Sequence, residues 1–333
     1  MEKLDRKTNS LNQSGAFLQF HILNELTKRN WSTLVETPVS IAPFNRNPET
    51  HPLLAGQFAK QRIISADNFT QAVLESQNQT MKEETSVDID AGKSIELKYE
   101  SHSANFRLCI EVKKNDPRYS DWCFFQQKIN TEPMRVITKN ITIKGRVCLF
   151  SVPPTDRYGN PIYVETNQFH FWDIFKHHIA DFALALQNEE VSKEYYRSEK
   201  TKVDEAARQI IKGTYGLIIE KILNQVSTAK DYSHSPDIFV PIIVTNANLF
   251  LCKFDSNKID PKSGHLTKDP QYVSVDSIIY ECPTPKGVQF PLSLASNLPA
   301  EFRNHVLKWH VLVMSPKGFV MFLDEIDKID MMH

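Results

Sequence analysis

The residues best placed for chemistry stand at the end of one apolar segment. Glu111 and Val112 close a segment, residues 106–112, in which most side chains are apolar, and Lys113 follows directly. In a β-strand alternate side chains point to the same face, so Glu111 and Lys113 would lie together with Val112 opposite them. The segment therefore predicts a carboxylate and an ammonium group side by side at the end of a buried, central strand.

Two more acids precede this segment. Asp88 and Asp90 alternate with Val87 and Ile89, a pattern that is typical of a short strand with both carboxylates on one face. If this strand pairs with the one that ends at Glu111, an aspartate lies beside that glutamate. A shared hard cation would relieve the repulsion between the two acids.

Acids and a lysine so placed supply what phosphodiester hydrolysis requires. Carboxylate oxygens would hold Mg²⁺, which polarises the phosphate and lowers the pKa of a bound water, while Lys113 would stabilise negative charge or orient that water. The backbone carbonyl of Val112 offers a further oxygen ligand. Oxygen ligands without His or Cys favour Mg²⁺, with Mn²⁺ as a substitute, over Zn²⁺.

With these residues the chain resembles the PD-(D/E)XK nuclease superfamily, the restriction-endonuclease-like phosphodiesterases. The signature corresponds here to Ser86-Val87-Asp88-Ile89-Asp90 and Ile110-Glu111-Val112-Lys113. The resemblance implies a Mg²⁺-dependent nuclease with Asp88, Glu111 and the Val112 carbonyl as metal ligands. Between the aspartates it favours Asp88, which apolar residues bracket, and Asp90 stays the alternative.

The resemblance also assigns roles on two helices. Family members often carry a Gln on the second core helix, and Gln209 matches it, with the role of orienting the substrate or Lys113. The first helix often carries an acid one turn after a Gly. Gln19 stands in that place after Gly15, so this chain departs from the family pattern at a second metal position.

The order of expected elements agrees with the family's core. These elements are a helix at 15–28, strands at 31–41, 85–91 and 106–112, a helix at 204–226 and a strand at 239–245. The implied fold class is α/β, with a central mixed sheet flanked by helices. Residues 1–115 would form the first part of the nuclease core, 116–203 an insertion, 204–255 the second part, and 256–333 a β-rich C-terminal extension.

Hydrophobic periodicity predicts further elements along the chain. Helices are expected at 58–76 and 171–187. Strands are expected at 94–100 after a turn at 91–93, at 141–152, at 161–166, at 249–254 in a hairpin with 239–245, and as a closing pair at 309–314 and 319–323.

The pattern [DE]xK is weak by itself, because the chain holds three copies. Asp260 and Lys262 stand in a polar loop, and Glu96 and Lys98 form the polar side of an alternating strand. Only Glu111 ends an apolar strand with acids one strand earlier. The alternative there is a surface ion pair, worth at most about 1 kcal/mol.

Composition limits the classes of protein that fit. The 333 residues include 39 Lys plus Arg and 40 Asp plus Glu, so a strongly basic nucleic-acid binder is excluded. No apolar run approaches the roughly 20 residues that cross a bilayer, and no secretory signal is seen at the start. Five widely spaced cysteines predict buried thiols in a reducing compartment. We therefore expect a cytoplasmic protein without a membrane partner.

Two functions remain open from the sequence. The first is a metal-dependent nuclease acting on nucleic acid, with DNA favoured over RNA as partner, and by analogy with such nucleases a role in restriction or antiviral defence. The second is a catalytically inactive module that binds nucleic acid or protein. Assembly as a homodimer is compatible with both.

Overall fold

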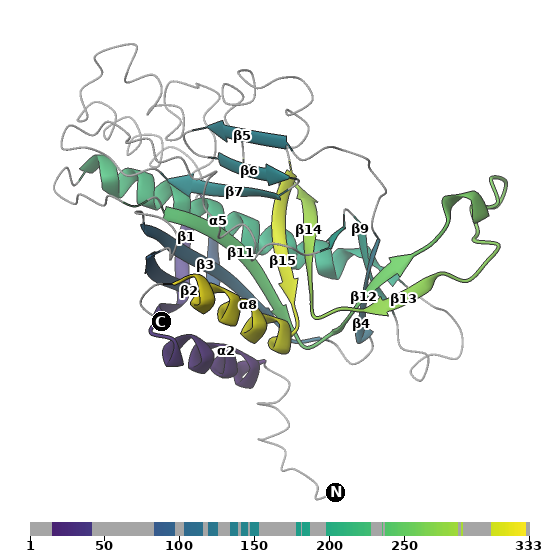
Figure 1. Ribbon diagram of the computed structural model, residues 1–333, viewed down its shortest axis with the longest axis horizontal. Coiled ribbons are helices and arrows are strands. Elements are labelled where there is room, and N and C mark those ends of the chain that lie inside the picture. The colour runs from purple at the N-terminus through teal and green to yellow at the C-terminus, as the bar shows by residue number, and fades with distance from the viewer. Residues whose placement is uncertain are drawn as a thin grey trace, which may run out of the picture.

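The computed structural model describes two β-sheets that share one long helix (Figure 1). The described residues are 15–41, 83–96, 103–115, 119–125, 134–138, 141–145, 147–152, 178–180, 182–186, 198–227, 235, 237–285, 288 and 308–330. The expected helix at 58–76 and strand at 161–166 lie outside them.

The central sheet is mixed. Its main path runs β1 (Ser32–Ile41), β2 (Glu83–Glu96), β3 (Ser103–Lys113), β11 (Asp237–Thr245), β15 (Lys308–Met314), β14 (Ser277–Pro283) and β8 (Ile179–Ala180). A branch leaves β11 through β7 (Val147–Val152), β6 (Ile141–Gly145) and β5 (Met134–Thr138). The first three strands are antiparallel neighbours, whereas β3, β11 and β15 are parallel. This confirms the expected fold class.

The second sheet is smaller and extends away from the first. Its order is β10 (Ser198–Glu199), β9 (Phe182–Leu186), β4 (Asp121–Phe125), β12 (Asn248–Lys253) and β13 (Gln271–Ser274). Between β12 and β13 the chain forms a 3₁₀ turn, η6 (Ser256–Lys258). Residues 254–270, which we call the arm, project from the rest of the molecule (Figure 1).

Among the described residues, three helices cover the central sheet. Helix α5 (Lys200–Ser227) packs on one face, and α2 (Ala16–Lys28) and α8 (Pro316–Ile329) pack on the other. The strand β3 divides its side chains between these layers, because Cys109 packs with the α5 layer and Leu108 and Ile110 pack with the α2 and α8 layer. Within the described residues, no helix is both long enough and apolar enough to cross a membrane.

Helices α2 and α5 confirm the two helices expected at 15–28 and 204–226. Gly15 begins α2 with a left-handed φ of 80°, a conformation that glycine adopts without steric cost. Helix α5 starts four residues earlier than expected. It contacts strands of both sheets and so helps to hold the two sheets together.

Two expected elements are wrong because tertiary pairing overrides local pattern. The turn at 91–93 is absent, and β2 runs without interruption because Gly92 pairs with Ser32 on one side and Arg107 on the other. The helix at 171–187 is replaced, within its described part, by β8 and β9. In β9 the buried residues Ala183 and Ala185 alternate with half-buried ones, the period of a strand.

The C-terminal half holds two further corrections. The expected hairpin does not form, because β11 enters the central sheet while β12 pairs with β4 in the second sheet. The expected strand at 319–323 belongs to α8. Ser315 caps this helix by accepting a hydrogen bond from the Gly318 N–H at 3.0 Å, and Pro316 occupies its first turn.

Segments 116–203 and 256–333 contribute strands to both sheets. From the first, β8 joins the central sheet and β4 and β9 join the second. From the second, β14 and β15 extend the central sheet and β13 closes the second. The C-terminal part is β-rich, as expected, with α8 as its last element.

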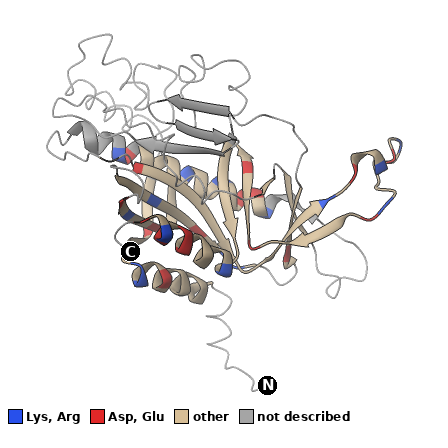
Figure 2. Cartoon of the chain, viewed as in Figure 1, with Lys and Arg blue, Asp and Glu red and all other residues tan. Residues whose placement is uncertain are grey.

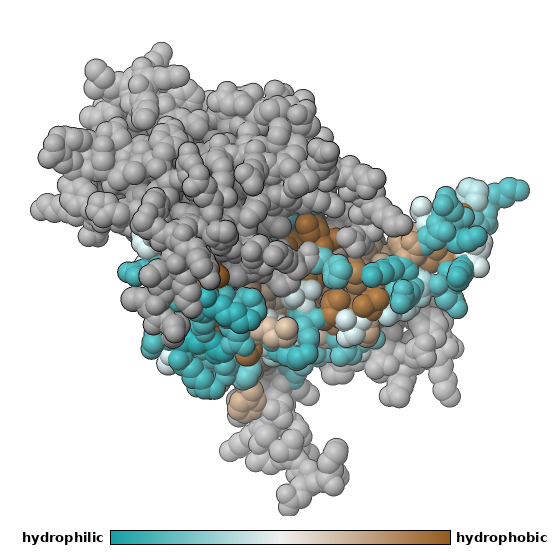
Figure 3. Space-filling model, viewed as in Figure 1, coloured by the Kyte–Doolittle hydropathy of each residue, from teal (hydrophilic) through white to brown (hydrophobic). Residues whose placement is uncertain are grey.

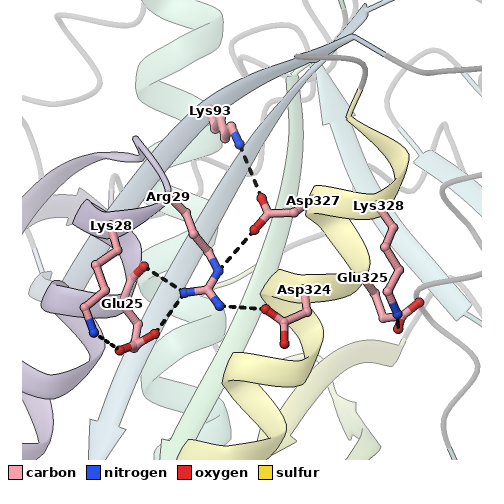
Figure 4. Close-up of polar contacts among 8 residues, drawn as sticks. All are labelled: Glu25, Lys28, Arg29, Lys93, Asp324, Glu325, Asp327 and Lys328. Carbon is pink, nitrogen blue, oxygen red and sulfur yellow. Dashed lines mark hydrogen bonds and ion pairs between the residues drawn. The ribbon is translucent and has the colours of Figure 1, made fainter. Parts of the chain in front are cut away.

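A cluster of charges fastens α2 to α8 on the face opposite α5 (Figure 4). The Arg29 guanidinium contacts Glu25 at 2.8 Å, Asp324 at 2.6 Å and Asp327 at 3.1 Å. Lys93 of β2 reaches Asp327 at 3.4 Å. Because one planar guanidinium binds acids from both helices, this cluster fixes their relative position.

Candidate active site

Asp88 and Glu111 face each other where β2 and β3 stop pairing. The last pair in the register is Ile89 with Ile110, so one step further places Asp88 opposite Glu111. At this point β2 changes its packing, because Val87 joins the α5 layer and Ile89 joins the opposite layer. The expectation that these two apolar residues share a face is therefore wrong, and Asp88 lies at the bend between them.

The bend aims Asp88 at the end of β3. Its Oδ2 accepts a hydrogen bond from the backbone N–H of Val112 at 2.8 Å. In a strand the N–H and carbonyl of one residue point to the same side, so the Val112 carbonyl also lies on the Asp88 side of β3. The register of β2 with β3 ends two residues before Val112. This geometry fits the expected role of that carbonyl as an oxygen ligand.

Glu111, Lys113 and Gln209 form a connected set. The Lys113 ammonium lies 2.5 Å from Glu111 Oε1 and donates a hydrogen bond to Gln209 Oε1 at 3.1 Å. The Glu111 side chain is only 1% exposed, whereas that of Lys113 is 35% exposed. Helix α5 thus supplies an amide that holds the lysine above a buried carboxylate. A role of Gln209 in orienting the substrate or Lys113 for catalysis stays a prediction.

The electrostatics of the two acids follow from burial. Burial, helped by the charge of Asp88 and opposed by Lys113, raises the pKa of Glu111 to about 7. Burial also raises the pKa of Asp88, against the Val112 hydrogen bond and the charge of Lys113, while Glu36 adds to the increase. Both acids are thus hard to ionise where they stand, which a cation between them would reverse.

Asp90 is engaged elsewhere. Its Oδ1 accepts a hydrogen bond from Arg107 Nε at 2.8 Å, and its Oδ2 contacts Arg107 Nη2 at 2.5 Å. Asp90 and Arg107 therefore form a two-point ion pair between β2 and β3. Of the two expected aspartates, the structure brings Asp88 to Glu111 and ties Asp90 to Arg107.

Two residues near Asp88 extend the site beyond the expected set. Gln19 of α2, expected to mark a departure from the family pattern, donates to the Asp88 backbone carbonyl at 3.3 Å. Glu36 of β1 falls opposite Asp88 in the register of β1 with β2, and its φ of 47° is left-handed. A left-handed non-glycine residue within a strand has no sequence signature, so local pattern does not predict the conformation of Glu36.

The other two [DE]xK copies do not resemble this site. Glu96 is exposed at the end of β2. Asp260 lies in the arm, where it accepts hydrogen bonds from the Lys262 backbone at 3.1 Å and the Ser263 hydroxyl at 2.6 Å. Neither acid is a buried carboxylate like Glu111.

The donor set fits one kind of cation. Among the described residues no three side chains of His, Cys, Asp or Glu converge as a metal site. Glu111 Oε2 is buried and makes no hydrogen bond to any described group. Mg²⁺ is typically held by one or two carboxylates with water and substrate phosphate, whereas Zn²⁺ takes three or four protein ligands. Asp88 and Glu111 therefore match Mg²⁺ better than Zn²⁺.

Comparison of the chain with protein-family models, with curated proteins and with solved structures found no match. What the site can do is therefore derived from its own geometry and charges.

Proposed function

We propose that this protein is a Mg²⁺-dependent nuclease that hydrolyses phosphodiester bonds in nucleic acid. One observation carries the proposal. Two acids from neighbouring strands face each other at a strand end, and the buried one has an oxygen without a hydrogen-bond partner among the described residues. A buried carboxylate oxygen left unpaired costs stability, and such a cost is typical of groups kept for function.

Asp88 and Glu111 would hold the Mg²⁺ ion, with the Val112 carbonyl as a third oxygen. The bound ion polarises the phosphate and acidifies a water. Lys113, partly exposed and held by Gln209, would stabilise the charge that develops on the phosphate or orient the attacking water. The Val112 N–H keeps the Asp88 carboxylate turned toward β3.

The test is a cleavage assay with the purified chain on labelled single-stranded DNA, duplex DNA and RNA. Cleavage is expected with Mg²⁺ or Mn²⁺ and is expected to stop in EDTA. Glu111→Gln and Lys113→Ala should each lower the rate at least about 100-fold, the usual cost of removing one group that stabilises developing charge.

Glu96→Gln is the matched control, because it neutralises an exposed acid on the same strand as Asp88. It should leave cleavage unchanged. If all three substrates stay intact with both metals, the nuclease proposal fails and the inactive binding module is favoured instead.

A further inference from the structure

The second sheet has one covered face and one apolar outer face. Toward α5 it presents the buried side chains of Trp122, Phe124, Leu249 and Leu251. Strand alternation sends the intervening residues outward. We call these residues the outer face: the half-buried Phe182, Leu184, Phe125 and Phe250, the buried Cys123 and Cys252, and the exposed Tyr272, with the exposed Phe254 just beyond β12.

Aromatic rings dominate this outer face. Phe125 contacts Phe182 with ring centroids 5.4 Å apart and Phe254 at 6.2 Å, and Phe250 contacts Tyr272 at 6.5 Å. The rings toward the arm are the most accessible, since Tyr272 is 53% exposed and Phe254 is 40% exposed. Figure 3 shows hydrophobic residues at the base of the arm and hydrophilic residues toward its tip.

Lysines flank the exposed rings. Lys253, Lys258, Lys262 and Lys268 lie on the arm or at its root, are exposed, and make no ion pair or hydrogen bond through their ammonium groups in the described structure. Figure 2 shows basic and acidic residues alternating along the arm. The available positive charge is therefore distributed along the arm that projects from the aromatic end of the sheet.

Two of the three aspartates in the arm accept hydrogen bonds from groups within the arm. Asp255 accepts a hydrogen bond from the Asn257 N–H at 3.0 Å, and Asp260 accepts those from Lys262 and Ser263. These hydrogen bonds shape the loop. The ammonium groups of the four lysines, in contrast, make no such contacts within the described structure.

The outer face begins beside the candidate active site. Thr245 pairs with Lys113 in the register of β11 with β3, and β12 starts three residues later at Asn248. The Asn115 N–H donates to Asn246 Oδ1 at 2.7 Å, which fixes this crossing between the sheets. From Asn248 the strand carries the outer face outward for about 20 Å, at roughly 3.3 Å per residue.

We infer that the outer face and the arm bind unpaired nucleotides, with bases stacked on Tyr272 and Phe254 and phosphates against the arm lysines. The inference rests on the proposed function, because it takes nucleic acid as the substrate. Aromatic side chains on a sheet with nearby cations are the usual means of holding single strands, since every base has a stacking face. A duplex hides those faces, so single-stranded nucleic acid is bound in preference.

The first experiment measures binding of a fluorescent 20-residue oligothymidylate to the full chain in EDTA, where hydrolysis by the metal site cannot occur. Tyr272→Ala should weaken binding about 5- to 100-fold, the range found for loss of one stacked base. Tyr272→Phe keeps the ring and should bind like the wild type. Tyr272→Leu keeps apolar bulk without a stacking face and should bind like Tyr272→Ala.

The second measurement separates charge from stacking. Lys258→Gln with Lys262→Gln should reduce the slope of log affinity against log salt by about 0.7 for each phosphate that is no longer neutralised. Tyr272→Ala should leave that slope unchanged. Lys328→Gln on α8 removes an exposed lysine that already pairs with Glu325, and it should change neither affinity nor slope.

Three results would overturn the inference: equal affinity of Tyr272→Ala and wild type, equal affinity for duplex and single strand, or a change in sedimentation from dimer to monomer in Tyr272→Ala without a change in oligonucleotide binding. The last result would make the outer face an interface between copies of the chain. Binding without any cleavage would instead reject the proposed nuclease and leave the inference standing.

Discussion

The carboxylate of Asp88 accepts the backbone N–H of Val112, the residue that separates Glu111 from Lys113. The backbone of β3 thus orients the carboxylate of Asp88 on β2. Strand β2 also carries Asp90, whose carboxylate is bound to Arg107 instead. Asp88 and Asp90 have similar neighbours in the sequence but different partners in the structure. Their substitutions should therefore have different effects on cleavage and on stability.

Asp88→Asn should abolish Mg²⁺-dependent cleavage with little loss of stability, because it removes a proposed metal ligand and keeps the side-chain shape. Asp90→Asn should spare metal binding but lower the free energy of unfolding on the order of 3 kcal/mol, since it leaves a largely buried guanidinium without its partner acid. Calorimetric Mg²⁺ titration and urea unfolding of both variants check this. The reverse assignment of effects would move the metal ligand to Asp90.

Metal binding should depend on pH through Glu111. Its pKa is raised to about 7, so the acid is mostly protonated below that pH and cannot ligate a cation. Mg²⁺ affinity should fall close to tenfold for each pH unit below 7 and level off above about pH 8. Titrations from pH 5.5 to 8.5 measure this, with Glu111→Gln as a control whose weak binding does not follow the same curve. A flat affinity from pH 6 to 8 would contradict the raised pKa.

The raised pKa of Glu111 also predicts that the free energy of unfolding falls as the pH rises, whereas Mg²⁺ affinity rises with pH. Glu111 in the unfolded chain ionises near its ordinary value of 4.5, so its contribution to stability is complete below that pH and is lost as the pH rises through about 7. The loss is at most about 3 kcal/mol. Glu111→Gln should therefore become progressively more stable than the wild type from pH 5 to pH 8. Urea unfolding at both pH values checks it, and a constant difference would be inconsistent with a buried charge.

Gly213 of α5 should be intolerant of a side chain, because a Cβ there would lie 2.4 Å from Val87 Cγ2. Overpacking costs about 1–3 kcal/mol and outweighs the gain of up to about 1 kcal/mol in helix propensity. Gly213→Ala should therefore destabilise the chain and, by displacing the residue before Asp88, slow cleavage. Thermal unfolding and the cleavage assay measure the two effects.

The matched control is Gly92→Ala, where a Cβ meets nothing within 4 Å. The clash is confirmed if Gly213→Ala costs less in a Val87→Ala background than in the wild type, with a coupling of at least about 0.5 kcal/mol. Additive effects of the two substitutions would rule out the contact as the cause.

Local pattern was sufficient for the centre of the site. The nearly all-apolar run before Glu111 predicted a central strand, and β3 does lie between β2 and β11. Alternation along that strand correctly placed Glu111 and Lys113 on one face. Helical periodicity placed Gln209 on a helix that packs on this same face. These features depend on short-range geometry, which sequence spacing encodes directly.

Local pattern failed where pairing with distant strands decides the outcome. The step from β11 to β12 looks like a hairpin, yet β11 is buried on both faces and needs parallel neighbours that lie far away in the chain. The bend at Asp88 and the left-handed backbone at Glu36 likewise follow from packing. For α8, in contrast, a signal was present: Ser315, Pro316 and apolar residues at helical spacing.

The position of β15 has a consequence for biosynthesis. Strand β11, at the middle of the central sheet, pairs with β15. Residues 308–329 supply β15 and also α8, which packs on the sheet face opposite α5. Before those residues leave the ribosome, the part of β11 that pairs with β15, residues 242–244, lacks its partner and the sheet face under α8 lies open to water. An emerging chain therefore passes through a stage that invites association with chaperones, and closure of the central sheet waits for β15 and α8 to be made.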